Sequence, residues 1–188
     1  DTSTPKINTL SPPASLPISL CRAAKAAGAV AVVANTFLIP VLQSPLALGA
    51  DVVLHSCTKY LNGHSDVVAG TVIAKDPQLA TELAWWANNI GVTSSAFDSY
   101  LLLRGIRTLA PRMAAAQRNA LAIVDFLKQQ PQVKKLYHPS LPDNEGHDIA
   151  ARQQKGFGAM LSFELEGDEE TLRLFLSNLT LFTLAESL

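Results

Sequence analysis

The sequence has 188 residues, with 15 Lys and Arg against 16 Asp and Glu, for a formal net charge of −1. This balance gives no reason to expect binding to nucleic acid or to an anionic membrane. With 48% hydrophobic residues the composition is globular, yet no apolar run reaches the ~20 residues of a membrane-spanning helix. Two cysteines, Cys21 and Cys57, cannot form a disulfide framework, so we expect a reducing, cytoplasmic setting.

The first half of the chain alternates predicted helices with apolar runs of strand length. Residues 1–18 are rich in Pro, Ser and Thr and are predicted to form a loop, and residues 19–27 form a helix that ends at Gly28. A buried strand, a short helix and two further buried strands are predicted over 29–34, 43–49, 51–55 and 67–74. This alternation is typical of α/β proteins with βαβ units and a mainly parallel sheet.

The second half is richer in helix. One helix is predicted over 77–90, and a longer one over 97–130 is expected to bend near Pro111, because proline removes a helix hydrogen bond. Strands and helices then alternate over 133–137, 147–155, 159–165, 168–176 and 181–184. We place a domain boundary near residue 115. Because the chain begins at Asp1 without Met and is apolar almost to Leu188, we expect it to be a fragment of a longer protein.

The segment 52–60, VVLHSCTKY, carries the side chains best suited to chemistry. Lys59 follows the carboxyl end of a predicted strand, which is the edge of an open α/β sheet where ligands bind. A lysine can form an imine with an aldehyde, and the hydroxyls of Ser56 and Thr58 can bind a phosphate. The segment therefore suits a cofactor that carries both groups. Taken alone, Ser-x-Thr-Lys is more often a turn with a solvated lysine.

Other groups of residues are weaker candidates. His55, Cys57 and His64 could bind a metal, but their spacing fits no closed zinc site and we expect none. Cys57 as a nucleophile with His64 as its base is equally weak, because packing explains a small residue there. We expect Trp85 and Trp86 in the core or in a subunit interface. A solvated helix face is expected for Arg104, Arg107 and Arg112.

Several stretches, taken together and in register, are similar to one known family. They are NTF, PLALGAD, HSCTKYLNGHSDV, YLLLRGIRT, YHP, GFG and TLAESL, which begin at residues 35, 45, 55, 100, 137, 156 and 183. These stretches resemble the Cys/Met-metabolism family of pyridoxal-phosphate (PLP) enzymes, the trans-sulfuration enzymes. The resemblance covers about residues 20–188 and is strongest to the bacterial cystathionine γ-synthase group.

The resemblance implies the aspartate-aminotransferase-like, type I fold of PLP-dependent α/β enzymes. Residues 1–115 would then be the carboxyl-terminal part of the PLP-binding large domain, with its mainly parallel sheet. Residues 116–188 would begin the smaller α+β carboxyl-terminal domain. It also implies a cytoplasmic protein that forms a homo-oligomer at full length, a tetramer in the family, with no nucleic-acid or membrane partner.

The resemblance also implies roles for individual residues toward pyridoxal 5'-phosphate. Lys59 would be the catalytic, imine-forming lysine that shuttles protons between substrate carbons. Ser56 and Thr58 would bind the cofactor phosphate, and Thr36 would lie beside the pyridine ring. In the family an Asp pairs with the ring nitrogen, and here Ala34 stands in that position. We therefore expect a weaker electron sink, and poor activity or none in this chain alone.

The implied reaction is a γ-replacement of methionine biosynthesis. An O-acylhomoserine would lose its acyl group to the sulfur of cysteine, which gives cystathionine. Ser187 would help to hold the substrate α-carboxylate, and Glu186 would lie at the distal end of the substrate. Two alternatives stay open at this point. One is a degenerate, non-catalytic homologue or a protein that only holds the cofactor, and the other is a related cystathionine γ- or β-lyase.

Overall fold

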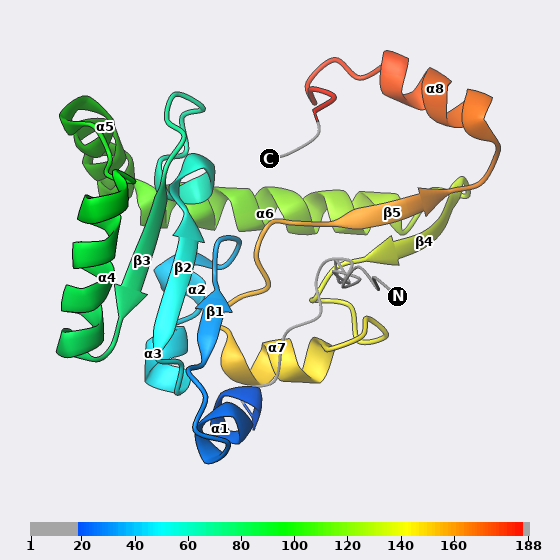
Figure 1. Ribbon diagram of the computed structural model, residues 1–188. Coiled ribbons are helices and arrows are strands. Elements are labelled where there is room, and N and C mark those ends of the chain that lie inside the picture. The colour runs from blue at the N-terminus through cyan, green and yellow to red at the C-terminus, as the bar shows by residue number, and fades with distance from the viewer. Residues whose placement is uncertain (1–18, 186–188) are drawn as a thin grey trace, which may run out of the picture.

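A computed structural model describes residues 19–185 of the chain. Its first half contains α1 (Ser19–Ala26), β1 (Val32–Ala34), α2 (Ile39–Leu42), α3 (Pro45–Leu48), β2 (Val52–Ser56), the π-helix η1 (Cys57–Leu61), β3 (Gly70–Ala74) and α4 (Pro77–Ile90). Its second half contains α5 (Ala96–Arg107), α6 (Leu109–Leu127), β4 (Val133–Tyr137), α7 (His147–Gln153), β5 (Ser162–Leu165) and α8 (Glu169–Ser177). The long helix α6 extends from the three-stranded sheet β1-β2-β3 to the two-stranded sheet β4-β5 (Figure 1).

The three-stranded sheet contains the three strands that the sequence predicts, but the third runs the other way. β1 and β2 are parallel, with Val32 opposite Val52, whereas β2 and β3 are antiparallel, with Val53 opposite Ile73. The segment 57–69 turns back at the end of β2 instead of crossing the sheet, so no βαβ unit joins these two strands. The prediction of a parallel arrangement is thus confirmed for one pair and wrong for the other.

Burial on both faces, which continuous apolar runs predict, is also only partly found. Val52 and Val53 in the central strand are buried, whereas Val32 in β1 is 53% exposed and Val72 in β3 is 52% exposed. Within residues 19–185, neither outer strand therefore contains a fully buried residue. The apolar pattern of these strands reflects surface that the described residues do not bury.

The helices of the second half follow their local signals, with one difference. Asp76 caps α4 through the Leu79 N–H at 2.9 Å, and Gly91 ends it in the left-handed conformation at φ 77°. The predicted bend at Pro111 is wrong, because the break lies at Thr108 between α5 and α6. Pro111 stands in the first turn of α6, where a backbone N–H has no helix partner to lose.

The predicted strand over 181–184 is not formed. These residues have bent or irregular backbone, and Leu181 is 93% exposed. An apolar run becomes a strand only when it can pair, and no strand among residues 19–185 pairs with this one. The part of the chain that the structure describes also contains no helix long and apolar enough to cross a membrane.

The larger of two core clusters lies under the end of β2. Its buried members come from α2, η1 and α6, and are Ile39, Leu42, Cys57, Leu61, Leu109 and Met113. Two of them, Cys57 and Leu61, are the first and last residues of the π-helix that contains Lys59. The turn that carries Lys59 is therefore anchored at both ends in the hydrophobic core, which limits how far its backbone can move.

Candidate active site

Lys59 lies in the π-helix that begins directly after β2. Its backbone departs from helical geometry, with φ −89° and ψ −128°, so the helix is kinked at this residue. The Asn62 N–H donates to the Cys57 carbonyl at 3.0 Å, and the Gly63 N–H donates to the Lys59 carbonyl at 2.8 Å. Gly63 then closes the turn at φ +74°, a conformation that favours glycine. The lysine is thus half-buried in a hydrogen-bonded turn at the sheet edge.

Thr36 and Ser56 meet at the same edge. They follow and end the parallel strands β1 and β2, and the Ser56 N–H donates to the Thr36 hydroxyl at 2.9 Å. The pairing of the strands continues next to them, where the Asn35 N–H donates to the Leu54 carbonyl at 2.9 Å. Because the carboxyl ends of parallel strands lie at one edge, the structure places Thr36 beside the turn that carries Lys59.

Thr58 joins the turn to the segment before β3. Its hydroxyl accepts a hydrogen bond from the Ala69 N–H at 3.1 Å and donates to the Ala69 carbonyl at 3.4 Å. The Cys57 N–H also donates to the Ala69 carbonyl, at 2.8 Å. A hydroxyl whose own donated bond is this long can turn its hydrogen toward an anion at little cost. Thr58 is therefore held in place while remaining able to donate.

Ala34 ends β1 at this edge, opposite Leu54 in the register, and its side chain is exposed. A methyl group can neither accept a hydrogen bond nor carry charge, so this position supplies no partner for a cationic ring nitrogen. Two further predicted site residues, Glu186 and Ser187, lie outside the described residues.

The alternative chemistries proposed for this segment find no support. Burial raises the pKa of the Cys57 thiol, which disfavours the thiolate that a nucleophile requires. The Nδ1 atom of His64 lies 2.7 Å from the Asn62 carbonyl oxygen, which can only accept a hydrogen bond, so this nitrogen donates and does not serve as a base. Among residues 19–185, no three His, Cys, Asp or Glu side chains are grouped so that they could hold a metal ion.

Arg112 lies near this turn, and its burial differs from what the sequence predicts. Arg104 and Arg107 are exposed, as predicted, but Arg112 is half-buried, so the solvated face expected for it is wrong. Its guanidinium donates to the Tyr60 carbonyl at 2.9 Å and to the Gly105 carbonyl at 2.7 Å. Tyr60 is 52 residues away in the chain, so no local pattern indicates this contact.

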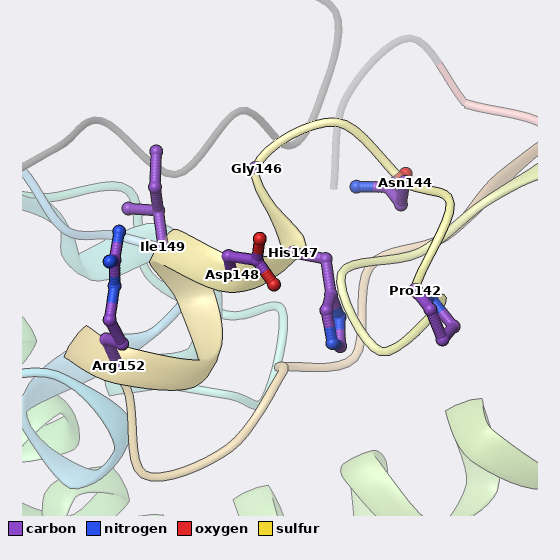
Figure 2. A pocket seen from close by; sticks show the side chains of 7 residues that line it. All are labelled: Pro142, Asn144, Gly146, His147, Asp148, Ile149 and Arg152. Carbon is purple, nitrogen blue, oxygen red and sulfur yellow. The ribbon is translucent and has the colours of Figure 1, made fainter.

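A hollow of about 270 Å³ lies elsewhere, around the start of α7. Figure 2 shows the side chains that line it, which are Pro142, Asn144, Gly146, His147, Asp148, Ile149 and Arg152. None of the predicted site residues is among them, and α7 lies well apart from the π-helix in Figure 1. The candidate site at the end of β2 is therefore not this hollow.

Comparison with known proteins identifies the family. The model of the Cys/Met metabolism PLP-dependent enzyme family matches residues 18–188. The chain belongs to this family. It is 78% identical to cystathionine gamma-synthase of Escherichia coli (strain K12) over an alignment of 169 residues. This alignment covers 90% of this chain and 44% of that protein. It is 53% identical over 165 residues to a cystathionine beta-lyase of Lactococcus lactis subsp. cremoris, which covers 88% of this chain and 43% of that protein.

Solved structures of the PLP-dependent family have the same fold. A cystathionine gamma synthase from Xanthomonas oryzae pv. oryzae, in complex with aminoacrylate and cysteine, matches with a TM-score of 0.89 at 56% identity. The match covers 91% of this chain and 44% of that structure. The predicted fold class, part of a type I PLP-dependent fold, is thereby confirmed. The chain spans less than half the length of the relatives that it matches.

The side chains at the end of β2 are of types that suit two of the three functional groups of this family's cofactor, its aldehyde and its phosphate, but not its ring nitrogen. One turn offers an amine for the aldehyde, from Lys59, and hydroxyls for the phosphate, from Ser56 and Thr58. At the third end, the ring nitrogen, Ala34 offers no carboxylate. The described residues thus suit covalent attachment and phosphate binding better than they suit activation of the ring.

Proposed function

We propose that this chain carries the lysine-bearing part of the active site of a PLP-dependent trans-sulfuration enzyme. The observation that supports this most is the turn at the end of β2, where Lys59 follows Ser56 and Thr58, and where Thr36 fixes the Ser56 backbone at 2.9 Å. When bound, pyridoxal 5'-phosphate supplies an electron sink for carbon acids. The protein supplies attachment, orientation and proton transfer.

The residues of the proposed site have different tasks. The Lys59 Nζ binds the aldehyde carbon and takes and returns protons at the substrate carbons. The Ser56 and Thr58 hydroxyls donate to the phosphate, and Thr36 contacts the ring. Ser187 and Glu186 bind the two ends of the substrate. Because Thr58 and Thr36 are already hydrogen-bonded to backbone, little ordering remains to be done when the cofactor binds.

The reaction that we propose for the full-length protein is the γ-replacement of the acyl group of an O-acylhomoserine by the sulfur of cysteine, which gives cystathionine for methionine biosynthesis. The 78% identity to the Escherichia coli synthase favours this over the lyase reactions, whose representative is 53% identical. We further propose a cytoplasmic homo-oligomer. Its chain would divide near residue 115, within the helix α6 that connects the two sheets.

A second function, cofactor binding without turnover, is favoured by Ala34. Loss of one partner from a partly buried ion pair typically costs about 3–5 kcal/mol. If half of that cost is felt in the transition state, the rate falls by about ten- to a hundredfold. A chain with Ala34 would then attach the cofactor at Lys59 and yet catalyse slowly or not at all.

The test is to add pyridoxal 5'-phosphate to the chain, reduce with borohydride and map the labelled peptides. We expect label on Lys59 in excess over Lys75, an exposed lysine at the other end of the same sheet that serves as an internal control. The variant Lys59→Ala should lose this label and Lys75→Ala should keep it. Label spread evenly over the lysines would contradict the proposed function. Turnover of O-acylhomoserine with cysteine, or its absence, separates the enzyme from the binder.

A further inference from the structure

The guanidinium of Arg112 connects three elements around the turn that carries Lys59. Its Nη1 donates to the Tyr60 carbonyl of the π-helix at 2.9 Å, and its Nη2 donates to the Gly105 carbonyl of α5 at 2.7 Å. Its Nε donates to the Thr108 hydroxyl, between α5 and α6, at 3.1 Å. A planar guanidinium can make three such bonds in one fixed geometry, which the single ammonium of a lysine cannot.

Two glycines leave the space that this arrangement needs. A Cβ atom on Gly63 would lie 1.9 Å from Arg112 Nη1, and Gly63 already has φ +74°. A Cβ atom on Gly105 would lie 2.3 Å from the Asn62 carbonyl oxygen. Any side chain at either position would therefore push the turn away from α5 or displace the guanidinium.

The hydrogen bond from Arg112 to the Tyr60 carbonyl lies next to the residue at which the π-helix departs from helical geometry. The backbone of Lys59 is not helical, so the usual helix ladder is interrupted at this residue. Its carbonyl is held by the Gly63 N–H at 2.8 Å, and the next carbonyl along, that of Tyr60, is held by Arg112 at 2.9 Å. These two peptide groups flank the Cα atom of Tyr60, and the first of them also borders Lys59, so holding both limits rotation of the backbone on the carboxyl side of Lys59.

We propose that Arg112 is a positioning residue, which holds the Tyr60 carbonyl and thereby limits movement of the turn on the carboxyl side of Lys59, so that the Lys59 side chain keeps its place. The inference rests on the proposed function for the task of Lys59. The link between Arg112 and the turn does not depend on it. Arg112 acts only through the backbone carbonyls that it holds.

The test uses hydrogen exchange of the chain without cofactor. Arg112→Met keeps an unbranched apolar stem and removes all donors, and Arg118→Met changes an exposed arginine on the same helix as the matched control. We expect the amides of Asn62 and Gly63 to exchange about tenfold faster in Arg112→Met, as for loss of one hydrogen bond to a charged group, and to be unchanged in Arg118→Met. The β4–β5 amides should keep their rates in both.

Two further variants change the same contact in other ways. Gly63→Ala keeps Arg112 but fills the space of its guanidinium and strains the backbone at φ +74°, so it should speed exchange of the same amides. Arg112→Lys should recover part of the protection. In the labelling experiment, the ratio of label on Lys59 to label on Lys75 should fall about tenfold in Arg112→Met and partly return in Arg112→Lys.

Wild-type exchange rates at Asn62 and Gly63 in Arg112→Met would overturn the inference, and label on Lys59 in the wild-type chain would show that the proposed function still stands. Faster exchange at every amide would also overturn it, because Arg112 would then be a general stabilising residue. A wild-type chain without label on Lys59 would contradict the proposed function alone. The exchange rates, which need no cofactor, would still decide the role of Arg112.

Discussion

Replacing Met113 by alanine is expected to destabilise the chain strongly, and the structure sets the magnitude. Met113 is 1% exposed and belongs to the same core cluster as Cys57 and Leu61, which flank Lys59. The change removes the buried Cγ, Sδ and Cε atoms, and full burial of a methionine side chain is worth about 1.5–3 kcal/mol on transfer, before any cavity forms. With the cavity included, the free energy of unfolding should fall by about 2–5 kcal/mol.

The assay is urea or thermal unfolding of Met113→Ala beside Leu121→Ala. Leu121 lies on the same helix and is 41% exposed, so its loss should cost under about 1 kcal/mol. For a chain of this length, a loss of about 3 kcal/mol lowers the melting temperature by roughly 6–12 °C. Equal losses in the two variants would refute the reasoning, because they would show that the cluster under Lys59 is not a packed core.

Three further outcomes are expected. Thr36→Val should lower stability by about 1–3 kcal/mol in urea unfolding and reduce label on Lys59, because it leaves the Ser56 N–H without its acceptor, whereas Thr36→Ser should retain both. Ala34→Asp should tighten cofactor binding, measured by titration of the chain with pyridoxal 5'-phosphate, and an unchanged affinity would count against the account of that position. Burial lowers the pKa of His55 and of His138, so the unfolded chain takes up protons first as the pH falls. Stability should therefore be full above about pH 6.5 and decrease below it, and a flat profile in urea titrations between pH 7 and 5 would contradict this.

The parts of the fold that the sequence predicts well are those with local causes. The helix α4 begins and ends where an Asp cap and a Gly place it, and both are visible in the sequence. The direction of β3 and the apolar run over 181–184 depend instead on which segments lie alongside, and neither can be read from the run itself. The expected bend at Pro111 is wrong for a related reason. Proline does not disrupt the first turn of a helix, and the sequence does not show where the first turn of α6 begins.

The candidate site divides in the same way. Lys59, Ser56 and Thr58 could be placed together because they follow one strand within a few residues. The contact of Thr36 with Ser56 depends on the pairing of β1 with β2, and the resemblance to a family supplied what spacing alone could not. Arg112 lies 52 residues from its partner Tyr60, with the strand β3 and the helices α4 and α5 between them, so only the folded arrangement reveals the contact.

The two tryptophans of α4 can serve as an intrinsic fluorescence probe of the surface of that helix. Trp85 and Trp86 are 57% and 51% exposed, and their rings meet edge to face with centroids 5.0 Å apart. They are therefore not in the core of this chain, and half of their surface faces water. Indole emission shifts toward the blue when water is withdrawn from the ring. If another protein surface covers α4, the emission maximum of these tryptophans should therefore shift to shorter wavelength, and the shift can be followed without an added label.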